Sequence, residues 1–222
     1  MKTFAFASLL AFAFSPDLVH AQGDTAPADR PRTLFGSGHE LANGGWGAPT
    51  AAYTRIMDKD AMLVGVRGGW LIDHRVTLGI AGHGLVTNIP NAAYDAHLAD
   101  QGRPVYGPSL FRTGYGGLLI EPIIAYRSPV HVSLPLIIGA GGAGYQLNAG
   151  LPHDFDPLTY ADDITAYFVI EPGIDVEVNL VRLVRLGLGA SYRYTSDLEL
   201  PGTPADAMRG FNTSISIKVG AF

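Results

Sequence analysis

The sequence contains no cysteine in its 222 residues, so neither a disulfide framework nor a thiolate metal site can hold the fold together. Charged residues are also scarce, at 16% of the chain, and the 15 Lys and Arg residues are scattered singly. Proteins that bind nucleic acids usually carry a basic patch, whereas the formal net charge here is −5. We therefore expect no nucleic-acid partner and a stability that comes from the fold itself.

The N-terminal apolar run, Phe4 to Phe14, is too short for a transmembrane helix, which needs about 20 residues. It follows the positive residue Lys2 and precedes Val19-His20-Ala21, a small-residue cleavage pattern. This arrangement predicts a cleaved signal peptide over residues 1–21, with a short buried helix as the alternative. The composition of residues 22–43, rich in Ala, Pro, Asp and Gly, predicts a flexible segment.

Glycine is abundant, with 28 residues, which disfavours helices because each glycine in a helix interior costs about 1 kcal/mol. The rest of the chain divides into runs of alternating apolar residues that are bounded by turn-forming residues. Each run is long enough for a tilted strand that crosses a bilayer, which needs about 9–11 residues. The runs predict eight strands, at 45–56, 61–72, 75–87, 114–126, 130–145, 165–178, 183–195 and 208–222.

The alternation is cleanest in the sixth and seventh runs. Ile170, Ile174 and Val176 fall on the face opposite Glu171 and Asp175. The seventh run repeats this scheme, with leucines and tyrosines opposite arginines. Such strands place one face against an apolar medium and the other against a polar one.

The connections between the runs alternate between short and long. Short turns lie near 73–75, 127–129 and 180–182, and long polar connections lie at 88–113, 146–164 and 196–207; the first connection, near 58–60, is a short exception. Outer-membrane barrels have this arrangement, with short periplasmic turns and long external loops. We therefore predict an all-β fold over residues 44–222, an eight-stranded antiparallel up-and-down transmembrane β-barrel in the bacterial outer membrane.

Taken together, the signal peptide, the eight runs, the short and long connections and Phe222 resemble the small eight-stranded bacterial outer-membrane β-barrel proteins. The segments Gly44–Pro49 and Arg67–Trp70 resemble those of uncharacterised members, a resemblance that implies no activity. We expect the partners to be outer-membrane lipids and the barrel-assembly machinery, and the protein to be a monomer.

Two features depart from the usual pattern of these barrels. Ile215, Ile217 and Val219 alternate out of step with Phe222, which requires a bulge or a frayed end of the last strand. Proline residues inside predicted strands remove ladder hydrogen bonds that lipid cannot replace. We expect β-bulges there, at Pro122, Pro135 and Pro172.

Aromatic residues lie near the ends of the predicted strands, and aliphatic residues fill the middles. This distribution predicts two girdles at the membrane interfaces; the alternative is that aromatic residues simply begin and end buried strands. The predicted girdle residues are Trp46, Trp70, Tyr126, Tyr115, Tyr145, Phe168 and Tyr194.

Charged residues on the inward faces form the most specific candidate site. Side chains nearly fill an eight-stranded barrel, so opposite charges there come within reach of one another. We predict a plug of ion pairs, with Arg67 as the counter-ion of Glu121 and Glu171; a gated conduit or a small polar-ligand site is the alternative. The cluster comprises Arg67, His83, Glu121, Glu171, Asp175, Glu177, Arg185, Arg193 and Lys218.

The sequence carries no recognisable catalytic or metal motif. Its histidines show no zinc spacing, and no serine lies in a G-x-S-x-G elbow. A membrane-embedded lipid-modifying enzyme would need a lipid-facing Ser and His, but Ser191 and His83 are expected to point inward. An acidic loop matches no calcium-binding pattern and is interpreted as solvated; it contains His153, Asp154, Asp156, Asp162 and Asp163. We expect no enzyme, no cofactor and no metal site.

Three functions remain open at the level of sequence. The first is a structural, adhesive or surface-interaction barrel that acts through its external loops. The second is a narrow channel or a barrel that binds a small polar ligand. The third is a soluble secreted carrier of an apolar ligand, like the lipocalins, which would turn its charged face to water.

Overall fold

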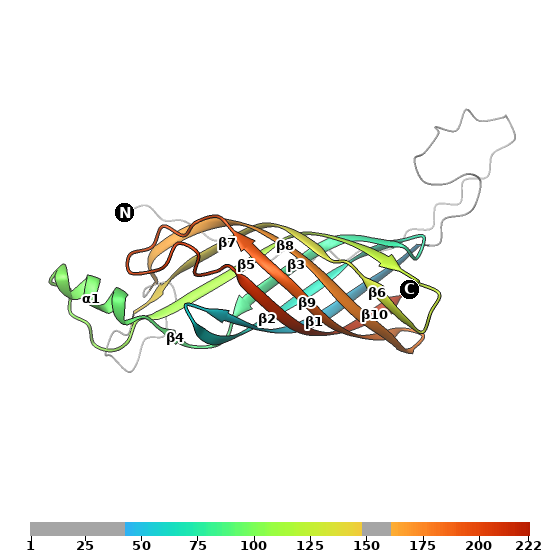
Figure 1. Cartoon of the computed structure of the whole chain (residues 1–222), viewed down its shortest axis with the longest axis horizontal. Coiled ribbons are helices and arrows are strands. Elements are labelled where there is room, and N and C mark those ends of the chain that lie inside the picture. Colours follow the sequence, from blue (N-terminus) through green and yellow to red (C-terminus); the bar gives the residue numbers. More distant parts are fainter. Residues whose placement is uncertain (1–42, 148–160) are drawn as a thin grey trace, which may run out of the picture. The chain divides into compact units, whose positions relative to one another are not determined.

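The computed structural model of the chain describes residues 43–147 and 161–222. The predicted signal peptide and nearly all of the predicted flexible segment lie outside these residues, as does most of the acidic loop. The described elements, drawn in Figure 1, are β1 (Asn43–Ile56), β2 (Lys59–Ile72), β3 (Val76–Leu85), β4 (Ile89–Pro90), α1 (Ala92–Asp100), β5 (Leu110–Ile124), β6 (Val130–Ser133), β7 (Leu136–Gln146), β8 (Ala161–Val181), β9 (Val184–Thr195) and β10 (Gly210–Ala221).

The strands close into a ring of eight. Neighbours in the chain pair antiparallel, and β1 pairs with β10, so that Gly45 lies opposite Ala221. The ring counts β6 and β7 as one strand, because both lie between β5 and β8 in the same register; β4 only extends the pairing of β5. The prediction of an all-β, eight-stranded antiparallel barrel is confirmed.

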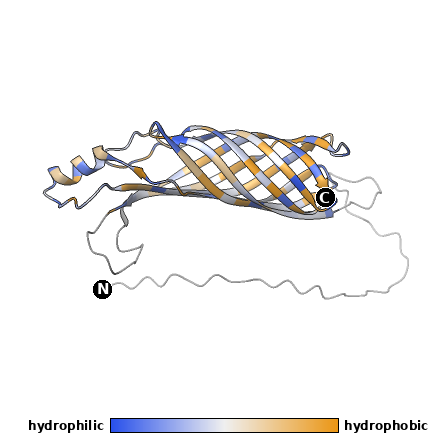
Figure 2. Ribbon diagram, turned by 90° about the horizontal axis from the view of Figure 1, so that it is seen from below, coloured by the Kyte–Doolittle hydropathy of each residue, from blue (hydrophilic) through white to orange (hydrophobic). Residues whose placement is uncertain are grey.

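The barrel has an apolar outside and a polar inside. Ile80 and Leu118 face outward and are 70% and 65% exposed, whereas Glu121 and Arg193 face inward and are fully buried. Figure 2 shows hydrophobic and hydrophilic residues interspersed along the strands of the barrel. This polarity is the reverse of a water-soluble barrel, whose charged face would meet the solvent.

The two ends of the barrel differ in their connections. We call one end the turn end; it carries the connections 73–75, 125–129 and 182–183 and the outermost residues of β1 and β10. The other, the loop end, carries the connections 57–58, 86–109, 147–160 and 196–209. Asp73 and His74 both have positive φ, 49° and 55°, as in the two-residue turns whose twist matches that of paired strands.

A helix lies within the connection that we expected to be a polar loop. The side chain of Asn91 caps α1 by accepting hydrogen bonds from the backbone N–H groups of Ala93 and Tyr94, at 3.0 and 3.4 Å. The buried residues of α1, Tyr94 and Leu98, face the end of the barrel. In the described part of the chain, no helix has the length and hydropathy needed to span a membrane.

The bulges predicted at the three prolines are wrong. The pairs Ser133–Asp175 and Leu136–Pro172 keep one register on either side of Pro135. The register shifts that are present lie elsewhere, between Ala143 and Tyr145 and between Asn179 and Val181. A missing N–H removes one ladder bond but inserts no residue, and the proline carbonyls still accept: Leu134 N–H bonds Pro122 at 2.9 Å, and Gly173 N–H bonds Pro135 at 2.8 Å.

Candidate functional site

The candidate site is the charged interior of the barrel. All nine residues of the predicted charge cluster project inward: His83 is half-buried and the other eight are buried. Those eight comprise four cations and four carboxylates, so their formal charges cancel. They are Arg67, Arg185, Arg193 and Lys218 with Glu121, Glu171, Asp175 and Glu177.

Nearest the turn end, Lys218 lies between two carboxylates. Its Nζ atom bonds Glu121 and lies 2.6 Å from Oε1 of Glu177. Glu177 also accepts a 2.5 Å hydrogen bond from Ser133 Oγ, and its Oε2 lies 3.2 Å from Nε2 of His131. Because these groups are buried, removing one partner would leave a charge without compensation.

Midway along the barrel, the guanidinium of Arg67 pairs with Asp175 at 3.0 Å, and both side chains are buried. The prediction that Arg67 is the counter-ion of Glu121 and Glu171 is wrong. Strands tilt around a barrel, so equal distance from a strand end does not put two residues at equal height. Glu121 pairs with Lys218 instead, and Glu171 uses neutral partners.

Towards the loop end, Glu171 accepts three hydrogen bonds from uncharged groups. Tyr115 Oη and Ser191 Oγ each lie at 2.6 Å, and Asn212 Nδ2 lies at 2.9 Å. The Oδ1 atom of Asn212 faces Arg193 Nη1 at 3.3 Å, so one amide bridges the carboxylate and the guanidinium. Arg193 Nε also donates to the backbone carbonyl of Met208 at 2.6 Å.

Sequence reasoning assigned no role in this network to its neutral members, although two of them carried a usable signal. The positions of Tyr115 and Glu121 in the same strand differ by an even number, which puts both side chains on one face. Ser191 bears the same relation to Arg193. The part of Asn212 depends on the register of β10 against β9, where it lies opposite Ser191, and a single sequence does not give that register.

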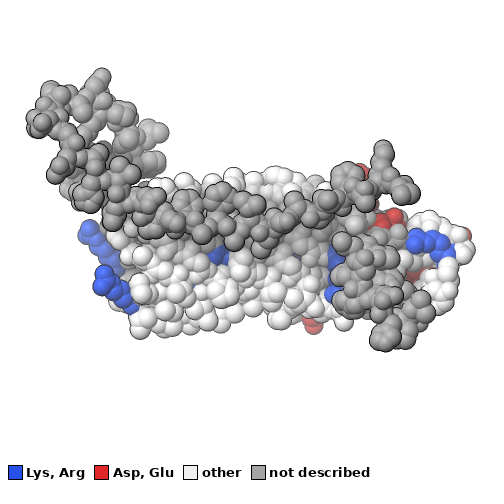
Figure 3. All heavy atoms as spheres, turned by 180° about the vertical axis from the view of Figure 1, so that it is seen from behind, with Lys and Arg blue, Asp and Glu red and all other residues white. Residues whose placement is uncertain are grey.

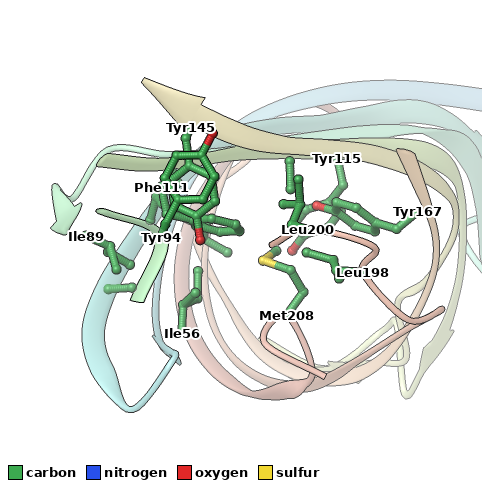
Figure 4. Close-up of a cluster of buried hydrophobic side chains, with 14 of the residues drawn as sticks. Ile56, Ile89, Tyr94, Phe111, Tyr115, Tyr145, Tyr167, Leu198, Leu200 and Met208 are labelled. Carbon is green, nitrogen blue, oxygen red and sulfur yellow. The ribbon is translucent and has the colours of Figure 1, made fainter. Parts of the chain in front are cut away.

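Apolar side chains close the loop end of the barrel (Figure 4). Tyr94 of α1 stacks on Tyr145 of β7, with ring centroids 3.7 Å apart. Asn91 donates hydrogen bonds to Tyr145 Oη at 2.5 Å and to the carbonyl of Gly202 at 2.9 Å, which links α1 to the connection between β9 and β10. That connection contributes Leu198, Leu200 and Met208 to the same buried cluster.

Aromatic and charged groups close the turn end. Trp46 is buried, donates to Thr77 Oγ1 at 3.0 Å and lies under Lys218, whose Nζ is 4.1 Å from the ring centroid. Phe222 follows the last residue of β10, and the guanidinium of Arg185 lies 3.7 Å from its ring centroid. Phe222 has the inward parity of Lys218 and packs against the buried cluster at this end of the barrel, so it falls out of step with the outward isoleucines without the predicted bulge; β10 keeps one register against β1 up to Ala221.

A small cavity of about 20 Å³ lies in the interior among Arg67, His83, Glu171, Asp175 and their neighbours. This volume is close to the roughly 10–15 Å³ that a single water molecule requires. Arg67 Nε and His83 Nδ1 are buried there without a hydrogen-bond partner in the described part of the chain. A space of this size holds no organic ligand.

Three of the predicted girdle residues are wrong: Trp46, Tyr115 and Tyr145 are buried inside the barrel, at 6%, 6% and 1% exposure. Trp46 lies one residue out of step with outward Gly45 and Gly47, so lipid does not contact its ring. Position near a strand end sets only the height of a side chain, and the face depends on register. Of the remaining residues, Trp70, Phe168 and Tyr194 are exposed and Tyr126 is half-buried.

The residues that bear on metal or nucleophilic chemistry are placed as follows. Among residues 43–147 and 161–222, no group of three His, Asp or Glu side chains is placed to hold a metal ion. Ser191 donates to Glu171, and His83 Nε2 lies 3.2 Å from Thr50 Oγ1. In the predicted acidic loop, His153, Asp154 and Asp156 and the side chain of Asp162 lie outside the described part, and Asp163 accepts a hydrogen bond from Tyr94 Oη at 2.8 Å.

No protein-family model matches the chain, and no curated protein sequence matches it. Solved structures do match. Neisserial surface protein A has 12% identity and a TM-score of 0.54, with 82% of this chain and 99% of that chain covered. The N-terminal β-barrel domain of Pseudomonas aeruginosa OprF has 8% identity, a TM-score of 0.47 and coverage of 82% and 99%. Ail, the attachment invasion locus protein of Yersinia pestis, has 9% identity, a TM-score of 0.41 and coverage of 80% and 97%. The closed ring and its likeness to the Neisserial protein show that the chain has the fold of the small eight-stranded outer-membrane β-barrels.

Proposed function

We propose that the protein spans the bacterial outer membrane as a closed barrel and presents its loop end to the cell exterior as a surface-interaction protein. In this proposal it is neither a channel nor an enzyme. The observation that carries the proposal is the combination of an apolar outer wall with an interior that ion pairs and aromatic side chains fill.

The outer wall supports a membrane location because charge is confined to its ends. In the described strands, the charged residues that do not point inward all lie at the loop end: Arg55, Lys59, Asp60, Arg112 and Asp163. On the face drawn in Figure 3, charged atoms gather mainly at the two ends, and few appear on the visible wall between them. Such a wall matches the apolar band of a transmembrane barrel.

The orientation follows from the connections. Outer-membrane barrels keep short turns in the periplasm and long loops outside, so the turn end would face the periplasm. Export would use the predicted signal peptide at residues 1–21, cleaved before insertion, and the barrel-assembly machinery would be a transient partner. The loops, with α1, would then be the part available to a partner outside the cell.

The filled interior argues against the two alternative functions. A conduit needs a continuous polar passage, whereas the loop end is closed by Tyr94, Tyr145 and Met208 and the turn end by Trp46 and Phe222. A carrier of apolar ligands needs an apolar interior, whereas this one holds eight charged side chains in the described residues.

Single-cysteine labelling tests the proposal cleanly because the chain has no cysteine of its own. Ile80→Cys lies on the outer wall and Glu199→Cys lies in an exposed loop at the loop end. We expect a membrane-impermeant maleimide to label Glu199→Cys on intact cells and to leave Ile80→Cys unlabelled until the protein is denatured. Labelling of Ile80→Cys in the native protein would contradict the membrane location.

A further inference from the structure

We propose that a groove on the outer wall near the loop end binds an acyl chain of a membrane lipid, and that Arg112 binds the phosphate of the same lipid. This inference rests on the membrane location proposed above and adds a defined lipid site to it. The groove has a volume of about 460 Å³ and lies over β5 and β7, with Ile164 of β8 at its edge. These strands adjoin one another in Figure 1.

The groove is apolar and shallow because outward side chains are missing from its floor. Gly114 lies opposite Gly142 in the β5–β7 pair, and Arg112 lies opposite Gly144. At Gly142 an added Cβ would come no closer than 3.8 Å to any neighbour, an ordinary contact distance. The close approach of strands therefore does not require glycine at this position, and the missing side chain leaves room on the outside of the wall.

The head of the groove carries a cation, Arg112, whose side-chain partners among the described residues are neutral. Arg112 Nε donates to Gln146 Oε1 at 2.8 Å, and Nη2 donates to Asn88 Oδ1 at 2.9 Å. Both acceptors are neutral amides, and no carboxylate of the described residues pairs with Arg112. The amides hold the guanidinium at the boundary between the apolar wall and the loops, where lipid headgroups would lie. Guanidinium groups bind phosphate by paired hydrogen bonds.

A second groove on the wall has the opposite charge at its head. It has a volume of about 500 Å³ and lies over β10, β1 and β2. Its polar end is the carboxylate of Asp60, which accepts a 2.7 Å hydrogen bond from Tyr53 Oη and lies 3.9 Å from Arg55 Nε. A lipid phosphate would be repelled there, so of these two grooves the one headed by Arg112 fits an anionic lipid.

The test measures which lipid the folded barrel retains. The full chain, folded in neutral detergent, is incubated with equal amounts of phosphatidylglycerol and phosphatidylcholine that carry the same acyl chains, and native mass spectrometry gives the bound ratio. We expect phosphatidylglycerol to be preferred and Arg112→Gln to reduce that preference about fivefold, as for one basic residue at an anionic lipid surface. Arg55→Gln, which removes a paired arginine, should leave it unchanged.

A variant that fills the groove with a side chain tests the proposal independently of Arg112. Gly142→Leu should lower retention of both lipids, whereas Gly47→Leu, also outward and with open space around its Cβ, should not. A preference that survives Arg112→Gln, or equal retention by the two leucine variants, would overturn the proposal. Each variant is first checked for faster migration when unboiled. If the wild type fails to enter membranes, the proposed function fails; if it inserts but the ratios do not change, only the groove proposal fails.

Discussion

Lys218 is the residue on which the turn-end charges depend most. Its ammonium is shared by two buried carboxylates and covers the ring of Trp46. We predict that Lys218→Met destabilises the barrel by about 3–5 kcal/mol, the cost of leaving a buried charge without its partner. The measurement is the midpoint of urea unfolding in lipid vesicles, followed by tryptophan fluorescence.

The double variant Lys218→Met/Glu121→Gln should regain part of the lost stability, because it removes one of the two carboxylates that Lys218→Met leaves without a cation. Lys59→Met removes an exposed lysine at the loop end and should shift the midpoint little. A Lys218→Met midpoint equal to that of Lys59→Met would show that the interior pairs contribute nothing to stability.

For single residues, the sequence predicted whether a side chain faces inward or outward better than it predicted which residue that side chain pairs with. Charge and alternation placed Glu121, Asp175 and Lys218 inside. The aromatic type of Trp46 suggested a lipid-facing position, and β1 has no inward charged residue that would have marked its inner face, since its one charged residue, Arg55, is exposed near the loop end. The face of Trp46 follows instead from Ala48, which lies opposite Arg67 in the β1–β2 pair. The Arg67–Asp175 pair depends on where tilted strands meet across the barrel.

The pairing of β2 with β3 depends on glycine. Gly79 lies opposite Gly69, and a Cβ at Gly79 would lie 2.0 Å from the carbonyl oxygen of Gly68. We predict that Gly79→Ala prevents closure of the ring or lowers the yield of folded barrel severely. Gly47→Ala, where a Cβ meets nothing within 4 Å, should fold like the wild type. The assay is the fraction that migrates faster without boiling; equal fractions would contradict the prediction.

Two loop-end elements are coupled through one side chain. Asn91 caps α1 and also bonds Tyr145 and Gly202, and loss of a cap alone costs about 1 kcal/mol. We predict that Asn91→Ala accelerates hydrogen exchange in two segments at once, 91–103 and 196–209. Glu199→Ala, in the exposed part of the second segment, should change neither. Faster exchange in only one segment would show that they are independent.

The strands were predictable because eight alternating runs leave few other folds, whereas the helix was not recognised. Its signals were present: Asn91 is a strong N-cap residue, and alanine, leucine and aspartate follow it. Its nine residues are shorter than the roughly 12–15 that an isolated helix needs. Contacts of Tyr94 and Leu98 with the barrel end therefore stabilise it, and these belong to the tertiary structure.

For the molecule as a whole, closure at both ends predicts an electrically silent barrel. We expect no steady current when the folded protein is inserted into planar bilayers, because the interior cavity at the Arg67–Asp175 pair is about the size of a water molecule. Insertion must be verified in the same preparation by heat-modifiable migration. A steady current that disappears in Glu121→Gln or Glu171→Gln would show that the charges line a conduit.

The pairing of β1 with β10 also sets the order in which the molecule can be made. Gly45 and Ala221 are neighbours in the ring, yet Gly45 is synthesised long before Ala221. Until β10 is available, β1 keeps an unpaired edge that invites pairing with other chains. The ring can therefore form only after the whole of β10 has been made, and the nascent chain must stay unfolded and protected from aggregation until then.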